Sequence, residues 1–270
     1  MATNEVERRR WNDEQWAAAW PKRERMTDAV TGLVLDAAAL RAGERVLDVG
    51  CGGGRTSIAV ARLVGPEGAV VGADISTPIT ALAKRRAEEA DVANVTFRVV
   101  DMQVEKVDGG PFDVALSQFG VMFFDEPAAA FANIRAHLRP GGRIAFGCWQ
   151  SMERNPWFFG HAIANLLPPP PVPASGKSLT GPFSLADVEQ TTGTLGAAGF
   201  TDVRRAAHEI EVDVPRDSVI DEEQLAMMGV SADDLGAATN AVDDYMRRFA
   251  LDGGLLRLPL AIQVFQAVNP

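Results

Sequence analysis

A glycine-rich turn between a short apolar run and an amphipathic segment constrains the fold of this chain most strongly. Residues 46–49 are apolar apart from Asp48 and predict a buried strand. The apolar residues of 57–63 recur at helical spacing. Between these segments stand Gly50, Gly52, Gly53 and Gly54. The order strand, glycine turn, helix is typical of an open α/β sheet that binds a ligand at the carboxyl ends of its strands.

The glycines match neither common phosphate-binding pattern. In G-x-G-x-x-G, the sixth position would be Arg55 when counted from Gly50 and Ser57 when counted from Gly52. The pattern G-x-x-x-x-G-K-[ST] is absent as well. What stands here is Asp48-x-Gly-x-Gly-x-Gly, which resembles the first motif of class I S-adenosylmethionine-dependent methyltransferases. A glycine turn without a ligand is the alternative that this motif alone leaves open.

Two further strands are predicted to end in carboxylates. Residues 68–75 read as a strand that ends at Asp74, where a carboxylate accepts hydrogen bonds from ribose hydroxyls. Residues 95–102 read as another, with Asp101 near its end. The resemblance implies that Asp101 accepts the adenine amino group and that Met102 lies beside the ring. It also places in the cofactor site Gly50, Cys51, Gly52 and Ile75.

An apolar stretch follows the fourth predicted strand, residues 112–117, where a loop would normally be polar. The resemblance places this stretch beside the transferred methyl group. Gln118 is then a candidate to bind the amino-acid part of the cofactor. Predicted walls of the acceptor pocket are Phe119, Met122 and Phe123, with burial of Met122 and Phe123 in the core as the open alternative.

The turn at residues 139–143 and the apolar run 144–149 predict a fifth strand, and the resemblance covers about residues 41–150. We expect a doubly wound, seven-stranded, Rossmann-like methyltransferase sheet with a helical cap. By resemblance its last strand is antiparallel and lies between the fifth and sixth. Three regions follow: helices in 1–40 that form a lid, a cofactor-binding core in 41–150, and the rest of the sheet with its cap in 151–270.

Aromatic residues outside the core region supply the remaining candidates. Trp16 and Trp20 would share a helix face, and Trp20 is the predicted lid contact to the cofactor, although stapling of this helix to the core is an alternative. His161, on a helix predicted to begin near residue 155, is the candidate general base, although a lone histidine is more often a packing residue. The predicted acceptor pocket is completed by Trp149, Trp157 and Phe158.

The composition narrows the class of partner. The formal net charge of −10 disfavours nucleic acid, and the chain holds no apolar run of about 18 residues that would predict a membrane span. Its two cysteines and three histidines lack metal-ligand spacing, so no metal is expected, and a reducing cytoplasm is the predicted location. The oligomeric state stays open, with a homodimer as one alternative.

These observations predict an enzyme that transfers a methyl group from S-adenosylmethionine to a small, largely apolar or aromatic acceptor, in secondary metabolism or quinone biosynthesis. One alternative is a partner protein that binds the cofactor without catalysis. The other is a nicotinamide-dependent oxidoreductase. The failed dinucleotide pattern and the lack of a Tyr-x-x-x-Lys pair around Tyr245, the single tyrosine, argue against it.

Overall fold

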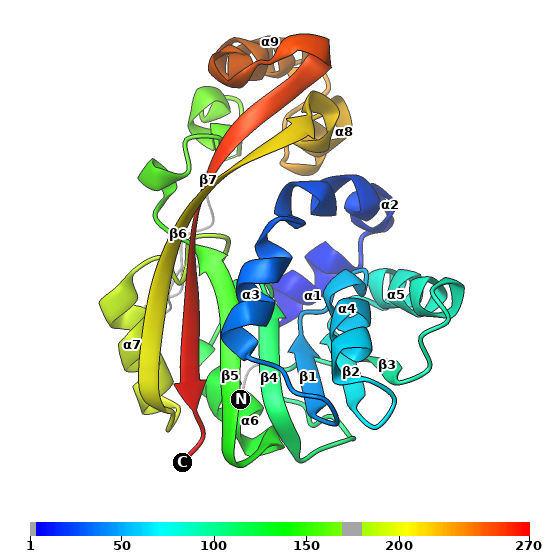
Figure 1. The fold of residues 1–270 in the computed structure, drawn as a ribbon. Helices are drawn as coiled ribbons and strands as arrows, with labels where there is room; N and C mark the ends of the chain where they lie inside the picture. The colour runs from blue at the N-terminus through cyan, green and yellow to red at the C-terminus, as the bar shows by residue number, and fades with distance from the viewer. Residues whose placement is uncertain (1–3, 169–179) are drawn as a thin grey trace.

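A seven-stranded sheet in the order β3-β2-β1-β4-β5-β7-β6 forms the centre of the computed structural model, which describes residues 4–168 and 180–270 (Figure 1). The first five strands pair in parallel, and β7 runs antiparallel to both β5 and β6, as predicted. The strands are β1 (Arg45–Val49), β2 (Ala69–Asp74), β3 (Val95–Val99), β4 (Phe112–Gln118), β5 (Leu138–Trp149), β6 (Thr201–Pro215) and β7 (Leu255–Val268).

Helices cover both faces of this sheet. One face carries α3 (Val30–Ala38), α4 (Arg55–Val64) and α5 (Thr77–Glu89), and the other carries α6 (Pro127–His137) and α7 (Val188–Ala197). Figure 1 shows α3 and α4 in front of the strands and α6 behind them. The strand order changes direction between β1 and β4, so a crevice forms at the carboxyl ends of these two strands.

Four further helices stand beyond that edge of the sheet: α1 (Glu5–Trp11), α2 (Glu14–Arg23), α8 (Glu222–Met227) and α9 (Leu235–Met246). Strands β6 and β7 continue past the other strands and carry α8 and α9 at their far ends (Figure 1). The sheet therefore has a helical cap over its carboxyl edge. No described helix has the length and apolar character needed to span a membrane.

Local sequence explains where the core elements begin. Gly54 takes a left-handed conformation (φ 81°) directly before α4, and the Ser76 hydroxyl accepts the backbone N–H of Ile79 at the start of α5. Phe146 of β5 and Phe265 of β7 are cross-strand partners whose stacked rings lie 5.3 Å apart. Both are fully buried, so this pair fixes the antiparallel strand against the parallel part of the sheet.

Several predicted boundaries were wrong. The segment from residue 155 to 167 forms no α-helix but the short 3₁₀ helix η4 (Phe159–Ile163), preceded by η3 (Met152–Arg154). Helix α7 is capped by Asp187, and the Ser184 hydroxyl donates to the Met122 carbonyl. The predicted turn at 139–143 is an irregular part of β5. The 3₁₀ helix η1 (Glu24–Thr27) lies between α2 and α3.

Candidate functional site

The glycine turn after β1 packs more closely than any side chain would allow. An added Cβ at Gly50 (φ 69°) would lie 2.6 Å from the Cα of Gly120, at the end of β4. The backbone N–H of Gly50 donates to the Ala73 carbonyl of β2 over 2.8 Å. The turn is thus held between its two neighbouring strands, and glycine is required where they meet.

The three predicted carboxylates do lie together at this edge of the sheet. Asp48 is 1% exposed and accepts the Ser57 hydroxyl over 2.5 Å. Asp74 accepts the backbone N–H of Gly52 and of Ser76, both over 2.9 Å. Burial raises the pKa of Asp48 to about 7, opposed by the hydrogen bond from Ser57 and reinforced by the charge of Asp74. Burial likewise raises the pKa of Asp74.

Asp101 anchors the N-terminal segment to this edge. Its carboxylate is 1% exposed and accepts the backbone N–H groups of Asn4, over 2.9 Å, and of Gln103, over 3.0 Å. A carboxylate has about four acceptor positions, so capacity for a ligand donor remains.

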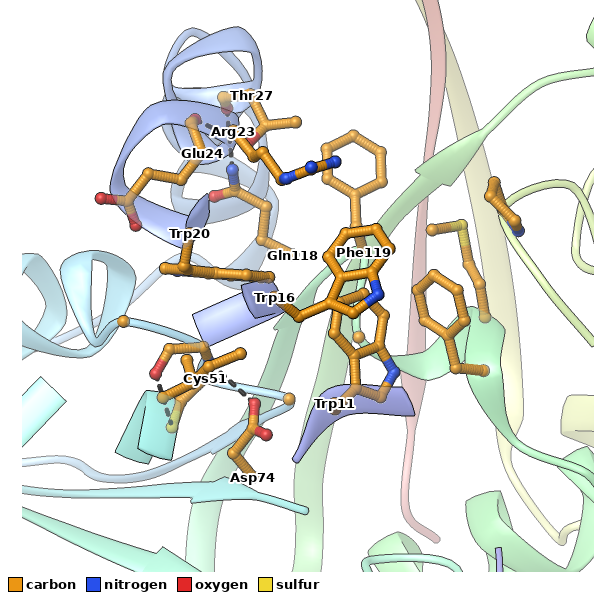
Figure 2. A pocket seen from close by; sticks show the side chains of 18 of the residues that line it. Trp11, Trp16, Trp20, Arg23, Glu24, Thr27, Cys51, Asp74, Gln118 and Phe119 are labelled. Carbon is orange, nitrogen blue, oxygen red and sulfur yellow. Dashed lines mark hydrogen bonds between the residues drawn. The ribbon is translucent and has the colours of Figure 1, made fainter. Parts of the chain in front are cut away.

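Trp20 of α2 lies directly over the glycine turn (Figure 2). An added Cβ at Gly52 would meet its indole ring at 2.5 Å. The indole Nε1 is buried and has no hydrogen-bond partner among the described residues. An unpaired buried N–H is costly, so this donor fits a ligand with an acceptor oxygen at the turn.

Gln118 ties the same N-terminal segment to β4. Its amide oxygen accepts the hydroxyls of Thr31, over 2.8 Å, and of Thr56, over 3.2 Å. Its amide nitrogen donates to the Thr27 carbonyl over 2.8 Å. The side chain lines the cavity but already has three protein partners. Gln118 therefore positions the segment that follows α2 as well as any ligand.

Aromatic side chains wall the neighbouring side of the site. Phe119 stacks on Trp149 with ring centroids 4.3 Å apart, and Trp149 contacts Trp157 at 5.0 Å. Phe119 adopts a left-handed backbone conformation (φ 63°), which is strained for a non-glycine residue and turns its ring from the strand end toward Trp149. Phe123 contacts Trp11 of α1 at 5.2 Å.

One cavity of ≈ 380 Å³ joins these groups. Every predicted cofactor and acceptor residue lines it, namely Trp20, Asp48, Gly50, Cys51, Gly52, Asp74, Ile75, Asp101, Met102, Gln118, Phe119, Met122, Phe123, Trp149, Trp157 and Phe158. Met122, whose burial in the core was the alternative, is 1% exposed and also lines the cavity. Met122 is therefore both a core residue and part of the cavity lining.

His161 is the predicted site residue that the structure leaves outside the cavity lining. It lies on η4, is exposed, and its ring packs edge-to-face on Tyr245 at 4.6 Å. The side chain of Asn155, where the α-helix was expected to begin, instead bonds the backbone of Ala261 in β7. The role of His161 as general base therefore stays a prediction, and its place outside the cavity lining argues against it.

The sequence analysis missed several cavity residues, which come from α2 and from the cap. Arg23 stands three residues after Trp20 and so shares its helix face, a signal present in the sequence. Ser218 and Gln224 carry no such signal, because only the folding of the cap brings them to the site. Within residues 4–168 and 180–270 no three acidic, histidine or cysteine side chains are grouped to hold a metal ion.

Comparison with known proteins identifies the family. Residues 46–142 match the family model of a methyltransferase domain. Nocamycin O-methyltransferase from Saccharothrix syringae is 30% identical over 190 residues, which are 67% of this chain and 68% of that enzyme. This chain is a class I S-adenosylmethionine-dependent methyltransferase, and S-adenosylmethionine is its cofactor. The three carboxylates that line the cavity, the glycine turn and the unpaired Trp20 N–H fit that cofactor.

Other relatives share shorter stretches or the fold. Aklanonic acid methyltransferase DauC from a Streptomyces species is 36% identical over 104 residues, which are 38% of this chain and only 47% of that enzyme. A phosphoethanolamine N-methyltransferase from Haemonchus contortus, solved with S-adenosylmethionine, shares the fold at 18% identity (TM-score 0.60, 96% of this chain and 57% of that chain). The [4+2]-cyclase SpnF is 25% identical (TM-score 0.56, 90% of this chain and 80% of that chain).

Proposed function

We propose that this methyltransferase transfers the methyl group to a small, largely apolar or aromatic acceptor in natural-product metabolism, which corresponds to EC 2.1.1.-. The observation that carries the proposal is the single cavity that runs from the glycine turn to the aromatic wall of Phe119, Trp149 and Trp157. The names of the nocamycin and aklanonic acid relatives agree with such an acceptor.

We assign cofactor binding to the polar end of the cavity and acceptor binding to the aromatic end. The proposed cofactor residues are Trp20, Asp48, Gly50, Cys51, Gly52, Asp74, Ile75, Asp101, Met102 and Gln118. The proposed acceptor residues are Phe119, Met122, Phe123, Trp149, Trp157 and Phe158. In this proposal residues 1–40 act as the lid, residues 41–150 hold the cofactor, and residues 151–270 complete the sheet and cap the acceptor.

When bound, the cofactor supplies a methyl group that is attached to a sulfonium. Transfer of this methyl group leaves a neutral thioether. The protein then has to hold the acceptor in line and exclude water, and such orientation contributes roughly 7–11 kcal/mol in favourable cases. The stacked Phe119 and Trp149 rings supply a rigid surface for an aromatic acceptor. Residues of α1 and α2, here called the roof, also line the cavity.

One finding favours a second candidate function. The neighbour SpnF carries the name of a [4+2]-cyclase, a reaction without methyl transfer. A neighbour in fold thus carries the name of another chemistry, which supports the alternative of a cofactor-binding protein that does not transfer the methyl group.

Two measurements separate these functions. Calorimetric titration with S-adenosylhomocysteine, with NAD⁺ as the control, should show micromolar binding of the first and none of the second. Incubation with methyl-labelled S-adenosylmethionine and a panel of aromatic phenols, acids and amines should then yield labelled product. Cofactor binding with no transfer to any acceptor would refute the proposed catalysis, and absence of cofactor binding would refute the site.

A further inference from the structure

Arg23 places a guanidinium at the acceptor side of the cavity. Its side chain extends from the end of α2 above Trp16, toward the side where Phe119 lies (Figure 2). The guanidinium carbon lies 4.4 Å from the centre of the Trp16 ring. Trp16 therefore holds the flat face of the cation and leaves its N–H edge for other partners.

The Arg23 guanidinium makes no hydrogen bond or ion pair with any residue in 4–168 or 180–270. Its Nε is buried and has no partner there. The carboxylate of Asp221, whose charge acts on Arg23, is instead bound by Lys22 over 2.6 Å. Burial lowers the pKa of Arg23, but an arginine stays charged at neutral pH.

The other cation that lines the cavity is paired. Arg55 lies 3.0 Å from the carboxylate of Asp28. Arg86, just outside the lining, pairs with Glu24 over 2.6 Å. Among these three described arginines, Arg23 thus differs in making no ion pair, although the charges of Asp221 and Glu223 act on it.

A second orphaned polar group lies close by. Ser218 is 4% exposed, and its hydroxyl lines the cavity without a hydrogen-bond partner among the described residues. It belongs to the 3₁₀ helix η5 (Arg216–Ser218), which contacts α2, the helix that carries Arg23. A half-buried cation with an unpaired Nε and a buried hydroxyl without a partner both line the cavity. Leaving such groups unpaired is unfavourable unless a ligand completes them.

We propose that Arg23 and Ser218 bind an acidic oxygen of the acceptor, a carboxylate or an enolate that is ionised at neutral pH. This inference rests on the function proposed above and specifies its substrate class. Guanidinium groups pair with carboxylates through two parallel hydrogen bonds, so Arg23 also orients the acceptor. The aromatic wall binds the remainder of the molecule.

An ionised acceptor explains a feature of the lining. No histidine, lysine or tyrosine is found among the described residues of the cavity, so the groups there that could remove a proton from a neutral hydroxyl are carboxylates and Cys51. An acceptor oxygen that is already an anion forms its bond to the methyl carbon while the carbon–sulfur electron pair goes to sulfur. No proton has to be removed in that step.

Calorimetric titrations, with and without saturating S-adenosylhomocysteine, test the inference with matched probes. The carboxylate pair is 2-naphthoate and its neutral isostere 2-naphthamide, and the enolate pair is 4-hydroxycoumarin and coumarin. We expect at least one anion to bind at least tenfold more tightly than its neutral partner. Arg23→Gln should abolish that preference and leave binding of the neutral probe and of S-adenosylhomocysteine unchanged.

Arg25→Gln is the matched control, because Arg25 lies in the same segment, is exposed, and is absent from the cavity lining. It removes the same charge and should keep the preference for the anion. The inference is overturned if neither anion binds more tightly than its neutral partner, or if both arginine variants lose the preference equally. Because S-adenosylhomocysteine is titrated separately, its failure to bind refutes the proposed function instead of this inference.

Discussion

Replacement of Asp48 by asparagine should stabilise the protein, and increasingly so as the pH rises. In the folded state burial raises the pKa of Asp48 from 3.8 to about 7. Between these two pH values the unfolded chain loses this proton while the folded protein keeps it. The free energy of unfolding therefore falls as the pH rises through this window, and the penalty is constant above about pH 7.

The size of this penalty follows from the pKa shift. About three pKa units, at about 1.4 kcal/mol each, give an upper limit of about 4 kcal/mol at pH 8. Asparagine keeps an oxygen to accept the Ser57 hydroxyl but cannot ionise. The stability gained by Asp48→Asn should therefore rise by up to about 1.4 kcal/mol per pH unit between pH 5.5 and 7, and level off above.

Urea unfolding of both proteins at half-unit steps from pH 5.5 to 8.5 measures this gain. Asp113→Asn is the control of opposite sign, because the pKa of Asp113 is lowered by the backbone N–H of Arg45 and by Arg139, against the effect of its partial burial. Because Asp113 ionises below this range in both the folded and the unfolded state, its loss should cost the same stability throughout pH 5.5–8.5, so a gain that changes with pH is specific to Asp48. A gain for Asp48→Asn that does not change with pH would refute the reasoning.

Three further substitutions test the site. Trp20→Phe removes the unpaired indole N–H and should weaken S-adenosylhomocysteine binding by about 1.5–3 kcal/mol in calorimetry, whereas Trp16→Phe should not. Asp74→Ala should weaken it by about 1–3 kcal/mol, and unchanged affinity in the folded variant would contradict the assignment. His161→Ala should keep methyl-transfer activity within about twofold, and a loss of a hundredfold or more would restore His161 as the base.

The cofactor end of the cavity could be predicted because its geometry is a property of parallel sheets. Asp48, Asp74 and Asp101 each follow an apolar run, and strands that run in parallel bring such positions to one edge. The glycine pattern then located the turn. What the sequence did not contain was the arrangement of the N-terminal segment, which reaches this edge through the hydrogen bond from Asn4 to Asp101.

The acceptor end was harder to predict, because contacts between distant segments decide it. His161 was placed on an α-helix that does not form, and Asn155, where that helix was to begin, bonds Ala261, more than a hundred residues away. Arg23 could have been noticed beside Trp20, but its lack of an ion pair depends on Lys22 binding Asp221 of the cap. Neither pairing leaves a signal in local composition or periodicity.

The placement of Trp20 and Arg23 on one helix links the two ends of the cavity. Both side chains leave the last turn of α2, one over the glycine turn and the other on the acceptor side (Figure 2). Two contacts with residues that follow α2 join this helix to the core: Gln118 bonds the Thr27 carbonyl, and Arg86 pairs with Glu24.

Any ligand that engages the Trp20 N–H restrains this helix and thereby restrains Arg23. We therefore expect the two ends to be coupled: the affinity for an anionic acceptor should rise when the cofactor end is occupied, and the affinity at the cofactor end should rise by the same factor when the anion is bound. The calorimetric titrations of the anionic probes, with and without S-adenosylhomocysteine, measure that coupling directly.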